Sequence, residues 1–80
     1  MSAPETPLEM TRRHVAEGDK RIARQELLIG ELDRHGHTAL AQRARELLAQ
    51  MEEFQRKARE HLDYEVAKLR KTRVQDEPQA

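Results

Sequence analysis

The stretch LIGELDRHGHTALAQRARELL, residues 28–48, decides the fold because two helix-like patterns meet in it at a single glycine. Gly36 stands where a helix ends in the left-handed conformation, and Thr38 is a residue type that caps the start of the next helix. A connection this short makes consecutive helices antiparallel neighbours. The stretch therefore predicts a helical hairpin with its corner at residues 36–38.

The start of the first helix is marked by TPLE, residues 6–9. Thr6 is a capping residue type, Pro7 suits the first helical position, and Glu9 follows Thr6 by three residues, as in a capping box. We expect a flexible tail at residues 1–5 and a helix over residues 7–35. Its heptad seam combines apolar residues spaced by seven with a weaker second row: Leu8, Val15, Ile22 and Ile29, then Thr11, Gly18, Gln25 and Leu32.

The second helix is predicted over residues 39–74, with a flexible tail at residues 75–80. Its apolar residues recur in steps of four and three, and after Ala58 the stripe moves by an extra four-residue step, which is a stutter in a coiled coil. The two helices together predict an all-α, antiparallel, coiled-coil-like hairpin over residues 6–74. Its expected core consists of Leu8, Val15, Ile22, Ile29, Leu32, Leu40, Ala44, Leu47, Met51, Phe54, Ala58 and Leu62.

A fold at residues 36–37 pairs positions whose numbers add to about 73. Three layers follow from this rule, namely Ile29 with Ala44, Ile22 with Met51, and Val15 with Ala58. Gly18 then falls beside Phe54. We expect this glycine to make room for the only phenylalanine of the chain.

The composition indicates that one hairpin is not the whole structure. Of the 80 residues, 38% are charged and only 2% are aromatic, so the chain can bury a narrow stripe but not a wide core. Apolar residues at three positions in seven are typical of a bundle rather than of a two-stranded seam. We therefore expect a homodimer or higher oligomer, most simply a four-helix bundle. Its candidate contact face consists of Ala16, Ala23, Leu27, Gly30, Leu48, Val66 and Leu69.

Several classes of protein are disfavoured by the sequence. The formal net charge is zero and there is no cysteine, which removes disulfides and thiolate chemistry. Neither a signal peptide nor a membrane-spanning run is visible, and the mixed charges of the second helix argue against a membrane surface, so we expect a cytoplasmic protein. Catalytic triads and glycine-rich phosphate loops are also missing from the pattern. We expect no enzymatic activity and no cofactor.

The histidines leave one metal-binding alternative open. In HGHT, residues 35–38, the two histidines are more simply the residues of a corner than ligands, because a metal site needs three or four converging groups. His14 and His61 have numbers that add to 75, so the hairpin can bring them together. A metal-binding hairpin using this pair is a weak alternative, since the H-E-x-x-H order of zinc hydrolases is lacking.

Nucleic acid is the other alternative partner. Residues 25–55 hold three basic and six acidic side chains, so this half carries −3 and the remainder of the neutral chain carries +3. Clusters of basic residues can hold phosphates, but aromatic residues for base stacking are lacking and cations also suit a helix C-terminus. We therefore regard nucleic acid as the less favoured partner. The candidate patch at the open end consists of Arg12, Arg13, Lys68, Arg70, Lys71 and Arg73.

One resemblance accompanies these patterns. The run RHVAEGDKRIARQELLIGELDRHGHT, residues 13–38, followed by LL, EEF and REHL, resembles a group of small uncharacterised helical-hairpin proteins from alphaproteobacteria. The resemblance covers roughly residues 13–62 and implies a bacterial helical hairpin, without catalytic or ligand residues. The expected function is that of a self-associating interaction module, such as an adaptor or regulator. Positions shared with that group include His14, Gly18, Gln25, Gly36, His37 and His61.

Overall fold

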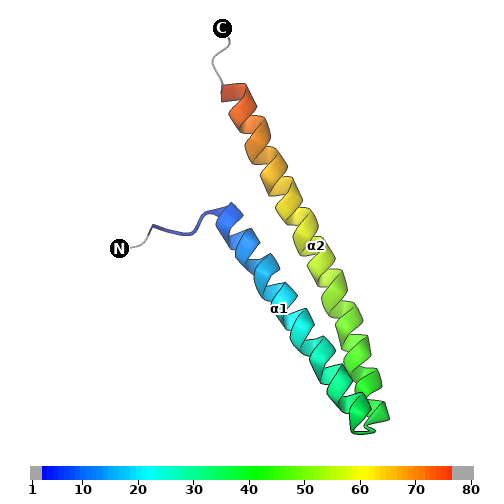
Figure 1. The fold of residues 1–80 in the computed structure, drawn as a ribbon. Helices are drawn as coiled ribbons and strands as arrows, with labels where there is room; N and C mark the ends of the chain where they lie inside the picture. The colour runs from blue at the N-terminus through cyan, green and yellow to red at the C-terminus, as the bar shows by residue number, and fades with distance from the viewer. Residues whose placement is uncertain (1–2, 77–80) are drawn as a thin grey trace.

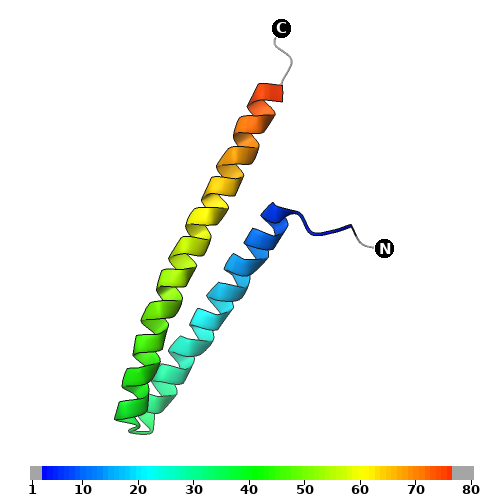
Figure 2. The ribbon, with the colours of Figure 1, turned by 180° about the vertical axis from the view of Figure 1, so that it is seen from behind.

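A computed structural model describes residues 3–76, with side chains described up to residue 72. The chain forms two long helices, α1 (Pro7–Arg34) and α2 (Thr38–Asp76), packed antiparallel in a hairpin (Figure 1). The predicted all-α hairpin is confirmed. Helix α2 has 39 residues and extends well past the start of α1. The view from behind shows the same difference in length (Figure 2). Of the expected C-terminal tail, residues 77–80 lie outside the described residues.

The start of α1 is capped as the sequence predicts. The Thr6 hydroxyl accepts a hydrogen bond from the Glu9 backbone N–H at 3.1 Å, and Pro7 occupies the first helical position. The Thr6 carbonyl accepts from the Met10 N–H at 2.9 Å, which closes the first turn. The cap satisfies N–H groups that have no partner inside the helix. It also fixes the beginning of α1 at Pro7.

The corner is a Schellman motif built on Gly36. This glycine has φ +76°, in the left-handed region, and its N–H donates to the Asp33 carbonyl at 3.1 Å. The His37 N–H donates to the Leu32 carbonyl at 2.9 Å, which is the second bond of the motif. The predicted role of Gly36 is confirmed.

The predicted cap of α2 is wrong by one residue. Thr38 is already the first residue of α2, and the Ala41 N–H donates to the His37 carbonyl at 2.9 Å. His37 therefore occupies the cap position. The Thr38 side chain is exposed, and its hydroxyl makes no hydrogen bond within the described part of the chain. The Schellman motif ends at His37, so α2 starts immediately afterwards and leaves no room for a separate cap.

The predicted seam of α1 is confirmed. Thr11, Val15, Gly18 and Ile29 are buried, and the remaining seam positions are half-buried, namely Leu8, Ile22, Gln25 and Leu32. Steps of three and four residues return to the same side of a helix, so these eight side chains form one stripe. This stripe faces α2.

The predicted seam of α2 is wrong in one of its two rows. Leu40, Leu47 and Phe54 are exposed, whereas the residue that follows each of them lies against α1. The observed seam consists of the buried Ala41, Ala44 and Gln55 with the half-buried Leu48, Met51, Ala58 and Leu62. Its steps alternate between three and four without interruption, so the expected stutter after Ala58 is also wrong. Hydrophobicity favours the bulkier row, but the helices pack through small and hydrogen-bonding residues instead.

The side of α2 that faces α1 is determined by two glutamines. The Gln55 Nε2 donates to the Val15 carbonyl at 2.7 Å and to Asp19 Oδ1 at 2.9 Å, while the Gln25 Nε2 donates to the Ala44 carbonyl at 2.9 Å. A polar side chain in a helix interface needs such partners, and here it finds them on the opposite helix. The bonds therefore fix which side of α2 faces α1.

Gly18 makes room for Gln55, not for Phe54 as the sequence suggested. A Cβ atom on Gly18 would lie 1.9 Å from the Gln55 Oε1 and 2.7 Å from its Cδ. The absence of a side chain is thus what lets the amide reach the backbone of α1. The numbers of Gly18 and Gln55 add to 73, so the expected pairing of levels across the hairpin holds at this layer.

The hairpin has little interior. Its extents of 68 × 30 × 14 Å make it a single layer, one helix thick. Within the described residues, the buried apolar side chains are those of Val15, Ile29, Ala41 and Ala44, and no large side chain is fully buried. A core of this size gives little hydrophobic stabilisation to a chain of 80 residues.

Candidate interaction surface

One side of the hairpin is closed by ion pairs between the helices. The Arg59 Nη2 lies 2.6 Å from Asp19 Oδ1, and Arg45 is paired with Asp33. Each of these residues follows a seam residue by four positions, which places all four on the same side of an antiparallel hairpin. We call this side the charged flank and define it by Asp19, Asp33, Arg45 and Arg59. The pairs are about half exposed, so they contribute more to specificity than to stability.

The opposite side carries large apolar side chains. Each of them precedes a seam residue by one position and is substantially exposed: Leu28 43%, Leu40 53%, Leu47 50% and Phe54 76%. On a helical wheel, this position lies across the seam from that of the charged flank. We call this side the apolar flank and define it by these four residues. On α2 they form a straight stripe, because a spacing of seven returns to the same position, and 14 residues span ~21 Å.

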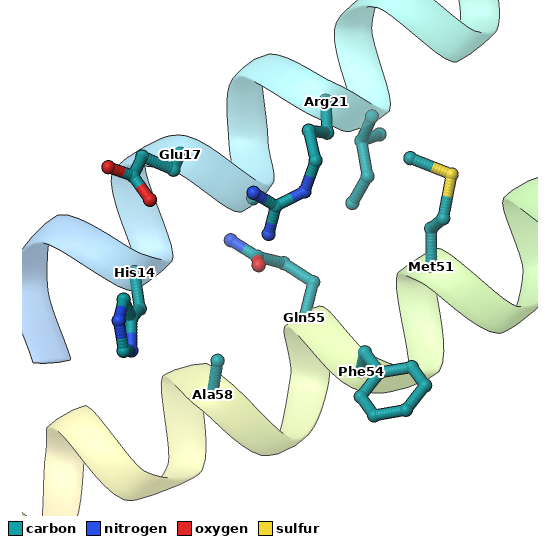
Figure 3. Close-up of a pocket in the computed structure, with 9 residues that line it drawn as sticks. His14, Glu17, Arg21, Met51, Phe54, Gln55 and Ala58 are labelled. Atoms are coloured by element: carbon teal, nitrogen blue, oxygen red, sulfur yellow. The ribbon is translucent and has the colours of Figure 1, made fainter.

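A hollow lies on the apolar flank beside Phe54. Close to it, Met51 and Gln55 extend from α2 toward α1, whereas the ring of Phe54 points away from α1 (Figure 3). The floor is open because Gly18 and Ala58 are small. The lining residues are His14, Glu17, Gly18, Arg21, Ile22, Met51, Phe54, Gln55 and Ala58.

A second hollow lies on the same flank at the open end. Pro7 precedes the seam residue Leu8, and Lys68 continues the seven-residue spacing of Leu40, Leu47 and Phe54 along α2. Leu8 and Leu69 supply apolar surface to it. Thr6, Glu65 and Thr72 complete the lining. The apolar flank thus offers protruding side chains toward the turn and hollows toward the open end.

The contact face expected from the sequence is not a single surface in the structure. On α1, Ala16 and Ala23 are exposed and Gly30 is half-buried; all three lie toward the charged flank, away from Leu28. On α2, Leu48 is half-buried in the seam, at the same heptad position as Ala41 and Gln55, so its assignment to an outer face is corrected. The other expected members are the exposed Leu27 and Leu69 and the half-buried Val66.

The sequence pattern does not single out Leu28, and it places Leu40, Leu47 and Phe54 in the seam between the helices rather than on the apolar flank. A signal for two of them is present in the sequence. Leu28 is followed by Ile29, and Leu47 by Leu48. Adjacent residues on a helix differ by about 100° in direction, so only one of each pair can face the partner helix. Doubled apolar residues therefore indicate a second apolar side.

The structure places the histidines on the surface. His14 and His61 are both exposed, and the His61 Nε2 lies 3.4 Å from Glu65 Oε1, one turn along α2. The described residues contain no group of three or more His, Cys, Asp or Glu side chains positioned to hold a metal ion. His35 and His37 flank the corner with their rings 6.5 Å apart. The metal-binding alternative stays a prediction.

The basic residues of the open end do not form one uniform surface. Arg12 lies at the heptad position of the charged flank and Lys68 at that of the apolar flank. Arg13 donates to Glu5 at 2.9 Å and to Glu17 at 3.2 Å. The Glu5 bond raises the pKa of Arg13 and lowers that of Glu5. The exposed Arg70 and Lys71 lie on α2 beyond the start of α1, and the side chain of Arg73 lies outside the described residues.

No protein-family model, curated protein or solved structure matches this chain. The resemblance to small alphaproteobacterial proteins therefore stays a prediction, and the geometry defines the class only as a two-helix hairpin protein. Neither described helix is both long and apolar enough to cross a membrane.

Proposed function

We propose that this protein is a non-enzymatic helical interaction module that self-associates through its apolar flank, so that two hairpins form a four-helix bundle. One observation carries the proposal. Leu28, Leu40, Leu47 and Phe54 lie exposed on one side of the hairpin, while ion pairs close the other side.

Burial of the apolar flank in a dimer would stabilise the hairpin. Burial of the exposed half of each large apolar side chain gains on the order of 1 kcal/mol. A two-fold interface uses the same patch on both copies, so each of these contributions counts twice. Within the part of the chain that the structure describes, no large side chain is fully buried, and this added burial would offset that weakness. Neighbouring antiparallel helices at shallow angles are the ordinary packing of such bundles.

The surfaces outside the bundle would be available to another protein. One of them is the part of α2 that extends beyond α1 (Figure 1). A module that dimerises through one side and presents a helix extension from each copy suits an adaptor or regulator. The nucleic-acid alternative is less supported, because Arg13 of the basic patch is already bonded to two carboxylates.

The mass in solution tests the proposal. Light scattering over a wide concentration range is expected to give twice 9.4 kDa for the wild-type chain. Leu47→Glu places a charge in the middle of the apolar flank and is expected to give 9.4 kDa. Circular dichroism on the same samples shows whether the variant stays helical.

Leu27→Glu is the matched control. Leu27 is 71% exposed on the same helix as Leu28 but points away from the apolar flank, so this variant is expected to stay dimeric. A helical wild-type monomer at every concentration would contradict the proposal. Dissociation by Leu27→Glu but not by Leu47→Glu would instead assign the interface to the side of Ala16 and Ala23.

A further inference from the structure

The apolar flank is bordered on each helix by a second row of side chains. A step of three residues turns a helix by about 300°, so the residue three positions after a member of the flank lies on the same side but farther from the seam. We call these two lines of residues the outer rows. The outer row of α1 consists of Met10, Glu17, Arg24 and Glu31, and that of α2 consists of Arg43, Gln50, Lys57 and Tyr64.

Two copies of the hairpin can lay their apolar flanks on each other in two ways. A two-fold axis perpendicular to the helices places α1 on α1 and α2 on α2. A two-fold axis parallel to the helices places α1 of each copy on α2 of the other, with both turns at the same end. Rotation about the parallel axis shifts neither copy along it, so the levels across the interface are those of the hairpin itself.

The outer rows match each other under the parallel axis. Residues at one level of the hairpin have numbers that add to about 73, as Gly18 and Gln55 do. Four pairs between the outer rows add to 74, namely Met10 with Tyr64, Glu17 with Lys57, Arg24 with Gln50, and Glu31 with Arg43. Two of these pairs join opposite charges, one joins apolar side chains, and none joins like charges. Among the residues that the structure describes, no ion pair joins the two rows within one chain.

The perpendicular axis gives no such match. It sets the outer row of α2 against the same row of the other copy, and that row contains Arg43 and Lys57 but no acidic residue. Its charges therefore find no partner in the opposing row at any register. Complementary charge at the edge of an interface favours one orientation over another.

The parallel axis also covers apolar surface with apolar surface. Leu40, Leu47 and Phe54 of the two copies lie at the same levels, and Leu28 lies close to the level of Leu47 of the partner subunit. The ring of Phe54 points away from α1 of its own chain (Figure 3). It would meet the partner's α1 at the level of Gly18, where the first hollow lies. Each copy would thus fill the hollow of the other.

From the outer rows and the hollow together, we infer that the bound partner is a second copy running in the same direction, turn beside turn, with α1 of each copy against α2 of the other. The net charge of the two ends hardly opposes this arrangement. Cut at the level of Phe54 and Asp19, the turn side holds six basic and seven acidic side chains, or −1, and the remainder of the neutral chain carries +1. The inference rests on the self-association proposed above and adds its direction and register.

Cysteine cross-linking tests the direction, because the chain has no native cysteine. Arg24→Cys and Gln50→Cys leave both expected ion pairs intact. The two single variants are mixed, denatured and refolded together, and then treated with a short thiol cross-linker. We expect the mixed 24–50 product, identified by peptide mass, and little product from either variant alone. Arg24→Cys with Glu52→Cys is the matched control, because the exposed Glu52 lies at the heptad position of the charged flank.

A charge exchange tests the register separately. Glu31→Arg is expected to raise the dissociation constant of the dimer by about tenfold, because the lost pair occurs twice in each dimer. Adding Arg43→Glu to the same chain is expected to restore most of the affinity, measured by sedimentation equilibrium.

Products that join two α2 helices, such as 43–43 or 43–50 from the corresponding cysteine variants, would overturn the inferred direction while leaving the proposed self-association intact. An equal yield from the Glu52→Cys control, or a double variant as weak as Glu31→Arg, would overturn the register. A monomeric mass by light scattering for the wild-type chain would overturn both proposals.

Discussion

Gly18 and Gly30 lie on the same helix, yet the structure predicts opposite effects for their replacement by alanine. A Cβ on Gly30 would meet only the end of Arg34, at 3.7 Å, which is an ordinary contact. Gly30→Ala is therefore expected to stabilise the chain by ~1 kcal/mol, the difference in helix propensity. A Cβ on Gly18 would lie 1.9 Å from the Gln55 Oε1, so the amide must move.

The size of the Gly18 effect follows from what Gln55 loses. Its Nε2 donates to the Val15 carbonyl and to the Asp19 carboxylate, and a displaced side chain gives up both bonds. At about 1 kcal/mol for a neutral bond and somewhat more for one to a charged acceptor, the loss is ~2 kcal/mol. The gain in helix propensity offsets about half of it. Gly18→Ala is therefore expected to destabilise by ~1 kcal/mol, which separates it from Gly30→Ala by ~2 kcal/mol.

A double-mutant cycle isolates the cause. Gln55→Ala removes the amide at a cost of ~2 kcal/mol, and the added methyl of Gly18→Ala then meets no obstacle. In that background Gly18→Ala is expected to stabilise by ~1 kcal/mol, as Gly30→Ala does.

Urea unfolding followed by circular dichroism provides the free energies, at one fixed chain concentration because association would change the midpoint. If Gly18→Ala stabilises the wild-type chain as much as Gly30→Ala does, the close approach of Gln55 to Gly18 is refuted.

Two further predictions concern a cap and acid. Thr6→Ala removes the hydroxyl that accepts from the Glu9 N–H and is expected to lower the free energy of unfolding by ~1 kcal/mol. Thr38→Ala is expected to have little effect, because the Thr38 side chain does not cap α2. If urea unfolding shows an equal loss of unfolding free energy for the two variants, Thr38 is a cap after all. The second prediction rests on Glu53, whose pKa is lowered from the ordinary 4.5 by a hydrogen bond from Arg56. The folded state thus binds fewer protons than the unfolded state. The stabilisation that Glu53 gains from Arg56 is therefore present above pH 4.5 and is lost as the pH falls toward the pKa of Glu53 in the folded state. Glu53→Gln is expected to flatten the fall of stability in acid, measured by thermal unfolding between neutral and acidic pH, and an unchanged pH profile would contradict it.

The sequence was sufficient for the fold of α1 because only one side of that helix carries a long apolar row. Leu8, Val15, Ile22 and Ile29 are spaced by seven, and no neighbouring row competes with them over the same length. The two ends of α1 were equally readable, since the cap at Thr6 and the left-handed turn at Gly36 depend on local chemistry alone.

The orientation of α2 could not be read in the same way. Two seams fit its pattern, and they share Ala44, Met51, Ala58 and Leu62. The remaining row is either Leu40, Leu47 and Phe54 or, one residue later, Ala41, Leu48 and Gln55. Hydrophobicity favours the first row, whereas the second is the one that lies against α1. The deciding interaction is a hydrogen bond from Gln55 to the backbone of a residue 40 positions away, which periodicity does not encode.

The row of α2 that hydrophobicity wrongly places in the seam is the row that forms the α2 part of the apolar flank. Taken together, the two rows make a stripe wider than a two-helix seam requires, and a stripe of that width is typical of a bundle. The hairpin uses the inner row and leaves Leu40, Leu47 and Phe54 outside. In the proposed dimer these three side chains face a second copy and are buried. If the proposed dimer forms, the sequence pattern marks core residues of that dimer, and the error lies in assigning them to the hairpin alone.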